Sequence, residues 1–233
     1  MFRDLVHNIV SDSKNQRAII EAFGTPGVGK SYVCSGVQHQ YIKDHGAISY
    51  HSIDDYHKNI FFRLLQKISV ILMGLVFSPS IVKLNFLMMM RFRKIKGLVK
   101  LKLFLNLLLI SSVIVIHRSQ NKPLLLDQGI FQALWSCYYY NNEAKCLTPG
   151  LVNIIDSLLD KLVLTNLLIF HISSDKAIIL SRLENRRVKG SSPLNSFEDS
   201  IIDRGIFATA AIRNLILKLA DNSGKVKVFE VKN

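Results

Sequence analysis

One octapeptide constrains the fold of this chain more than any other segment: residues 24–31 read GTPGVGKS. It matches the pattern G-x-x-x-x-G-K-[ST] at every fixed position. The apolar run 18–23 before it predicts a buried strand, and residues 30–43 after it predict a helix. Glycines let successive backbone N–H groups turn inward around a polyphosphate, and a helix start adds a positive dipole end. In this context we expect a nucleotide-binding loop rather than a chance glycine-rich turn.

The residues of this loop have distinct expected roles. The Lys30 ammonium reaches the β- and γ-phosphate oxygens, and the Ser31 hydroxyl is a ligand for Mg²⁺. Asp127 ends the apolar run 124–126, where a second metal ligand or a partner of Ser31 is expected. Alternatively it is an ordinary turn residue. The expected nucleotide contacts from this segment are Gly24, Thr25, Pro26, Gly27, Val28, Gly29, Lys30, Ser31 and Tyr32.

The rest of the chain alternates short apolar runs with helical patterns. This alternation predicts a three-layer α/β fold with five parallel strands and helices on both faces of the sheet. The expected strands are 18–23, 47–52, 123–127, 166–172 and 226–231. The expected helices are 30–43, 57–77, 80–95, 97–117, near 130–138, 148–162, 175–187 and 195–221.

The order of these parts resembles the small-molecule and nucleotide kinases of the P-loop class, with the thymidylate kinase-like branch nearest. The segments that carry the resemblance are GTPGVGKS, PLLLDQG and NLLIFHISSDKAIILSRLENRR. The resemblance implies ATP and Mg²⁺ as cofactors, catalytic roles for Lys30 and Asp127, and lid arginines at Arg182, Arg186 and Arg187. Arg182 and Arg186 share a helix face, which suits clamping of phosphates, with Arg186 also catalytic. A solvated basic helix end is the alternative.

Two departures bear on the acceptor. That branch usually has Arg after the strand-end Asp, whereas this chain has Gln128. Its acidic-Pro-Gly signature after the second strand is replaced by Ser-Ile-Asp-Asp-Tyr at 52–56, so thymidine monophosphate is not the expected acceptor. Asp54 and Asp55 follow the second strand, where ligands bind in open α/β sheets. Asp54 is therefore a candidate base for an attacking hydroxyl, or else these residues begin the next helix.

The charge of the chain is concentrated in one block. The net charge is +13, and residues 56–126 contain 12 Lys or Arg and no Asp or Glu. The same block contains the longest apolar runs, which predicts a basic helical insertion at 57–117 between the second and third strands. The run 98–116 is nearly long enough to span a bilayer, but it contains Lys100, Lys102 and Asn106.

Three interpretations of the insertion remain. The run 98–116 is an internal helix buried by 57–77 and 80–95, it packs on a partner, or it lies on an anionic membrane surface. Nucleic-acid binding is the weaker interpretation, because the basic residues lie among Leu and Met rather than among stacking aromatic residues. The three cysteines are too few and scattered for a disulfide framework or a zinc site.

Together these features predict a single kinase-like domain over 1–233. It transfers the γ-phosphoryl group of Mg-ATP to a small or lipid-linked acceptor. The alternative is an ATP-dependent switch or accessory protein that docks through 57–117. The first 20 residues lack the layout of a signal peptide, so we expect a cytoplasmic protein, peripheral to the inner membrane face if the insertion binds lipid. The oligomeric state stays open, and a dimer is compatible with the sequence.

Overall fold

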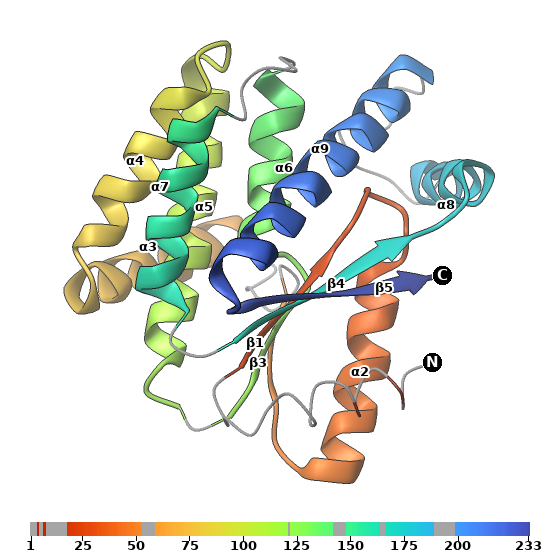
Figure 1. Cartoon of the computed structure of the whole chain (residues 1–233), viewed down its shortest axis with the longest axis horizontal. Helices are drawn as coiled ribbons and strands as arrows, with labels where there is room; N and C mark the ends of the chain where they lie inside the picture. Colours follow the sequence, from red (N-terminus) through yellow and green to blue (C-terminus); the bar gives the residue numbers. More distant parts are fainter. Residues whose placement is uncertain are drawn as a thin grey trace.

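The computed structural model describes residues 4, 7, 18–52, 59–120, 122–141, 148–163, 166–188 and 199–233, with backbone alone at 186–188, 199–201 and 223. Its centre is a five-stranded sheet in the order β2-β3-β1-β4-β5 (Figure 1). Every pair of neighbouring strands is parallel. The strands are β1 (Ile19–Phe23), β2 (Ser49–His51), β3 (Leu124–Leu126), β4 (Leu167–Ser173) and β5 (Val226–Lys232). All five expected strands and the parallel α/β fold are therefore confirmed.

The helices also follow the sequence pattern. They are α2 (Lys30–His45), α3 (Ile60–Phe77), α4 (Ser80–Arg91), α5 (Gly97–His117), α6 (Ile130–Asn141), α7 (Pro149–Leu162), α8 (Lys176–Val188) and α9 (Asp199–Ser223). Their ends have local causes. Thr148 accepts a hydrogen bond from the backbone N–H of Leu151, and Pro149 occupies the first turn of α7, where its missing N–H costs nothing.

Two hydrophobic cores cover the two faces of the sheet, which makes three layers. On one face, Ile19, Leu124 and Ile169 pack against α5, α6, α7 and α9. On the other face, Ile20, Leu125 and Phe170 pack against α2 and α8. Successive strand residues point to opposite faces, so strands buried on both sides must be apolar throughout. This explains why β3, which reads Leu-Leu-Leu, is fully buried.

The parallel arrangement brings several loops to one edge of the sheet. β1 pairs with β3 from Ile19↔Leu124 onward, and β2 pairs with β3 from Ser49↔Leu124 onward. The loop after β1, Ser52 after β2 and Asp127 after β3 therefore lie at the same carboxyl edge, which is where open α/β sheets bind ligands.

The basic insertion lies between β2 and β3, as expected, and consists of α3, α4 and α5. The prediction that residues 98–116 form an internal helix is correct for the second half of α5, where Leu107, Ile110 and Ile114 are buried in the core. It is wrong for the first half, where Leu98 is 83% exposed. The expectation that 57–77 would help bury this helix is only partly met, because α3 itself stays largely uncovered.

Candidate nucleotide-binding site

The phosphate loop connects β1 to α2 and requires glycine at two of its positions. Gly27 and Gly29 have φ angles of 93° and 92°, a left-handed conformation that L side chains rarely adopt. A Cβ on Gly27 would also lie 3.2 Å from Ile179 and Leu183 of α8. Gly29 precedes the first turn of α2, which contains no acidic residue. The positive end of this helix therefore opens onto the loop, as an anion-binding site requires.

Lys30 lies over the loop. Its Nζ donates hydrogen bonds to the carbonyl oxygens of Gly24 at 2.9 Å and Thr25 at 3.2 Å. The ammonium is only partly buried, so it lies beside the loop backbone and within reach of a phosphate held there. The expectation that Lys30 serves the phosphate site is consistent with this placement.

Ser31 and Asp127, 96 residues apart in the sequence, form a hydrogen bond. The Ser31 hydroxyl donates to Asp127 Oδ2 at 3.1 Å, and Ser52 Oγ donates to the same oxygen at 3.3 Å. The backbone N–H of Asp127 donates to the His51 carbonyl at 3.3 Å, which fixes the residue between β2 and β3. Asp127 is buried, and an ordinary turn residue has no need of two serine partners. This geometry favours the functional interpretation of Asp127.

The donor set around Ser31 suits Mg²⁺. A hydroxyl and a carboxylate are hard oxygen ligands, and Mg²⁺ in nucleotide sites takes one or two protein oxygens and completes its shell with phosphates and water. Across the described residues, no group of three or more His, Cys, Asp or Glu could hold a metal by itself. Ser31 and Asp127 are therefore the residues that would hold Mg²⁺, together with the nucleotide.

Cys34 lies one helical turn after Ser31 and is buried. Burial, and after it the negative charge of Asp127, raises the pKa of its thiol. The thiol therefore stays protonated and is not a nucleophile at this site.

A buried polar network holds the start of the loop. Thr25 Oγ1 and Thr209 Oγ1 of α9 are 2.9 Å apart, and Trp135 Nε1 of α6 donates to Thr209 Oγ1 at 2.9 Å and to the Gly205 carbonyl at 3.1 Å. Thr25 is thereby tied to two helices from the second half of the chain. The sequence analysis did not identify Trp135 or Thr209, because no local pattern reports a contact across 184 residues.

Glu21 supports the other side of the site from within the sheet. Its Oε1 accepts a hydrogen bond from the backbone N–H of Gln132 at 2.8 Å, at the first turn of α6. A Cβ on Gly129 would overlap the Glu21 carboxyl group, so only glycine allows this approach. Burial raises the pKa of Glu21 to about 8, although the backbone hydrogen bonds from α6 oppose the shift. Glu21 thus anchors the turn 127–129 that carries Asp127.

Arg182 reaches the phosphate loop from α8, since its Nη1 donates to the Val28 carbonyl at 2.9 Å. Asn233, which the sequence analysis did not identify, donates to the same carbonyl through Nδ2 at 2.7 Å. Tyr32 lies on α2 with 63% of its surface exposed. The side chains of Arg186 and Arg187, and the whole of Asp54 and Asp55, lie outside the described residues, so their roles stay predictions.

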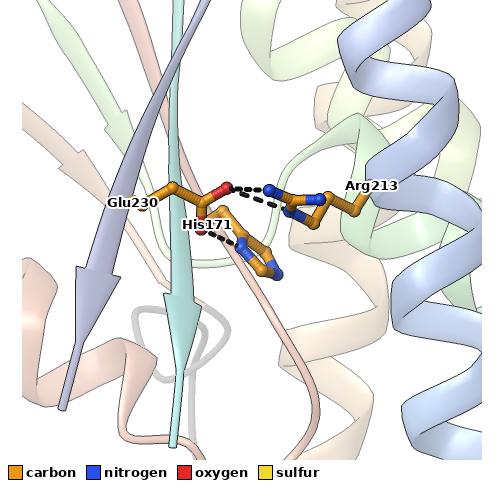
Figure 2. Close-up of polar contacts among 3 residues, drawn as sticks. All are labelled: His171, Arg213 and Glu230. Atoms are coloured by element: carbon orange, nitrogen blue, oxygen red, sulfur yellow. Dashed lines mark hydrogen bonds and ion pairs between the residues drawn. The ribbon is translucent and has the colours of Figure 1, made fainter.

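A second polar cluster braces the sheet beside the loop (Figure 2). Glu230 of β5 contacts His171 Nδ1 of β4 at 2.5 Å and Arg213 Nη2 of α9 at 2.7 Å. Partial burial acts in the opposite direction, but the hydrogen bonds from His171 and Arg213 hold the pKa of the Glu230 carboxyl below its usual value. His171 pairs with Phe23 at the end of β1, with their rings 5.8 Å apart. The cluster therefore joins β4, β5 and α9 just before the phosphate loop begins.

Comparisons with known proteins add a similarity of overall structure. No protein-family model and no curated protein sequence matches the chain. Among solved structures, the chain is similar to the deoxyadenosine kinase of M. mycoides with dCMP and dCDP bound, at a TM-score of 0.47 and 14% identity, covering 91% of this chain and 89% of that one. The dATP-bound form of that kinase gives a TM-score of 0.44 and 15% identity over the same shares. The similarity is one of overall arrangement.

Proposed function

We propose that the chain is a kinase that transfers the γ-phosphoryl group of Mg-ATP to a small or lipid-linked acceptor. The observation that carries the proposal is the hydrogen bond between Ser31 and Asp127, formed at the start of a helix whose loop is covered by Lys30. Phosphate-binding backbone, a cation and a hydroxyl–carboxylate pair are the parts that phosphoryl transfer requires.

In this proposal each residue has a physical task. The loop N–H groups hold the phosphate oxygens, and Lys30 moves from the carbonyls of Gly24 and Thr25 to the β- and γ-phosphates. Ser31 and Asp127 would hold Mg²⁺, and a bound Mg²⁺ would supply positive charge to the phosphates. Arg182 lies close enough to the loop to contact the nucleotide, and Arg186 supplies positive charge to the group in transfer. Asp54 remains the candidate base for the acceptor hydroxyl.

The space for an acceptor is a cavity of about 620 Å³ beside β2. Tyr50 and His51 of β2 line it, together with Phe62 and Gln66 of α3 and His117 of α5. The cavity follows β2 from Ser49 to His51, and Ser52, which donates a hydrogen bond to Asp127, comes directly after His51. A mixed lining of apolar and hydrogen-bonding groups suits a ligand with a polar head and an apolar body.

One experiment distinguishes the kinase from the ATP-dependent switch. ADP formation is measured on the full chain with Mg-ATP, alone and with acceptor panels of nucleosides, sugars and hydroxyl-bearing lipids. A kinase forms ADP in proportion to one acceptor class and produces the phosphorylated acceptor. Slow ADP formation that no acceptor changes would reject the kinase in favour of the switch. The absence of Mg-ATP binding in thermal-shift measurements would reject both.

A further inference from the structure

The helix α3 turns its apolar side chains toward the outside of the protein. Of its 18 residues, all of them described, only Gly74 is buried. Val76 is 80% exposed, Ile60 73% and Phe77 67%. The apolar face is the set of exposed large side chains on this helix other than Phe62 and Leu65, which line the cavity beside β2: Ile60, Phe61, Leu64, Ile68, Leu72, Met73, Val76 and Phe77. An uncovered set of this size marks an interaction surface in a folded protein.

The charged residues of α3 lie on its other side. Arg63 and Lys67 are half-buried, on the side that carries Gly74. A Cβ on Gly74 would lie 2.6 Å from the Ser112 Cα, so this side packs closely on α5. Burial, followed by the like charges of Arg63 and Lys102, lowers the pKa of Lys67. A helix that faces water has the reverse arrangement, with its charges outside and its apolar stripe inside.

Positive charge is exposed on the same insertion as the apolar face. The basic turn between α4 and α5 exposes Arg91, Arg93, Lys94 and Lys96. Figure 1 shows α3, α4 and α5 grouped together, on the side opposite α8 and the carboxyl end of β5. Residues 56–126 contain 12 Lys or Arg and no Asp or Glu, so the insertion carries a strong net positive charge.

We propose that the apolar face of α3 and the basic turn dock this protein on an anionic lipid bilayer. Charge complementarity decides between this surface and a second copy of the chain. An isologous contact would bring two acid-free, positively charged insertions together, and like charges oppose such a contact. Anionic lipid offers acyl chains for the Phe, Leu and Ile side chains and headgroup charge for the Arg and Lys side chains.

The helices lie on the bilayer rather than across it. By length and composition, α3 and α5 are apolar enough to cross a membrane, with mean hydropathies of 1.9 and 2.2. However, the second half of α5 is part of the core that covers the sheet, and Gly74 fixes α3 against it. Spanning would also place Arg63 and Lys67 in hydrocarbon, which is costly. Interfacial binding keeps the fold intact and places the protein on the surface of the bilayer.

The test is vesicle flotation of the full chain, with vesicles of phosphatidylcholine alone or mixed with phosphatidylglycerol. We expect binding to the mixed vesicles only, weakened by high salt. Replacing Arg91, Arg93, Lys94 and Lys96 by Gln should lower the partition coefficient roughly tenfold or more. The combined variant Leu64→Gln, Leu72→Gln and Val76→Gln should lower it similarly. The matched controls lie elsewhere on the surface: Lys43, Lys161, Lys218 and Lys232 changed to Gln together, and Ile178→Gln.

A second measurement does not depend on how the multiple variants fold. In Phe61→Trp, the indole replaces one exposed aromatic ring by another, and its emission should shift to the blue on anionic vesicles, whereas Phe207→Trp on α9 should not shift. The proposal is overturned if the wild-type chain ignores anionic vesicles, or if binding survives both sets of substitutions. A dimer that the α3 variant dissociates, with no vesicle binding, would instead assign the apolar face to a second copy.

Discussion

The phosphate loop and the α3–α5 insertion contrast in how their polar and apolar groups are arranged. At the loop, Lys30, Ser31 and Asp127 are polar groups held by specific hydrogen bonds in a packed sheet edge. In the insertion, α3 exposes large apolar side chains and holds Arg63 and Lys67 half-buried against α5. The described polar groups of the first region are therefore fixed within the protein itself. The insertion exposes a large apolar surface to water, which is typical of a surface that binds a membrane or another molecule.

The largest effect should come from the carboxylate at the loop. Asp127→Asn keeps the size of the side chain but removes the charge that would hold Mg²⁺. We expect turnover to fall on the order of 10³-fold. Calorimetry should also show that ATP affinity no longer depends on Mg²⁺, whereas Asp221→Asn, an exposed control, keeps wild-type values. Wild-type Mg²⁺ dependence in a folded Asp127→Asn protein would return Asp127 to an ordinary turn residue.

A smaller effect is expected from the helix α8. Arg186→Ala should lower turnover on the order of 10²-fold while changing ATP affinity much less, because a lid arginine contacts charge best placed after closure. Steady-state kinetics separate the two quantities, and Arg182→Ala provides the comparison, since Arg182 contacts the loop before any nucleotide is bound. Equal turnover in Arg186→Ala and wild type would leave Arg186 as a solvated residue.

A substitution where α3 packs on α5 should lower the free energy of unfolding and leave the ATP affinity unchanged. In Gly74→Val the new side chain overlaps Ser112 and pushes α3 from α5, which should cost about 1–3 kcal/mol of unfolding free energy. Denaturant unfolding and calorimetry of the same protein measure both quantities. Val76→Ala, on the exposed side of the helix, serves as the control. A large loss of ATP affinity in Gly74→Val would show that the insertion and the phosphate loop are coupled, which contradicts their expected independence.

A dependence of stability on pH is expected from Glu21, whose folded-state pKa of about 8 lies above its ordinary 4.5. The folded state therefore keeps a proton that the unfolded state loses, so stability should fall as pH rises between these values, by at most about 1.4 kcal/mol per pH unit. Glu21→Gln keeps the oxygen that accepts from Gln132 and should flatten this dependence, whereas the exposed Glu184→Gln should not. If the unfolding free energy fell equally steeply with pH in Glu21→Gln and in the wild type, Glu21 would not be the group that titrates.

The sequence is sufficient for features that depend on local patterns. The loop 24–31 carries its own glycines and helix start, and the apolar runs mark the five strands, so both follow from residues close together. The joint placement of Ser31 and Asp127 follows as well, because parallel strands end at one edge.

Features that depend on packing between distant segments are not visible in the sequence. Thr25 meets Thr209 and Trp135 only after α6 and α9 pack over the sheet, and Glu21 in β1 looks like any strand residue until α6 starts above it. The apolar run 57–77 predicts burial, yet only the packing of α4 and α5 decides how much of α3 is covered. Hydropathy shows that a segment is apolar, but it does not show whether the rest of the protein, a membrane or a partner covers that segment.

The central claim, that the loop at 24–31 binds the phosphates of Mg-ATP, is tested most directly by calorimetric titration of Mg-ATP into Lys30→Ala. Because Lys30 Nζ donates to the loop carbonyls of Gly24 and Thr25 at 2.9 and 3.2 Å and lies partly exposed, outside the hydrophobic core, the variant should keep its fold. We expect the ATP affinity to fall on the order of 10²-fold through the lost charged hydrogen bonds, while Lys43→Ala at the far end of α2 binds as wild type does. Unchanged ATP affinity in a folded Lys30→Ala protein would contradict the account.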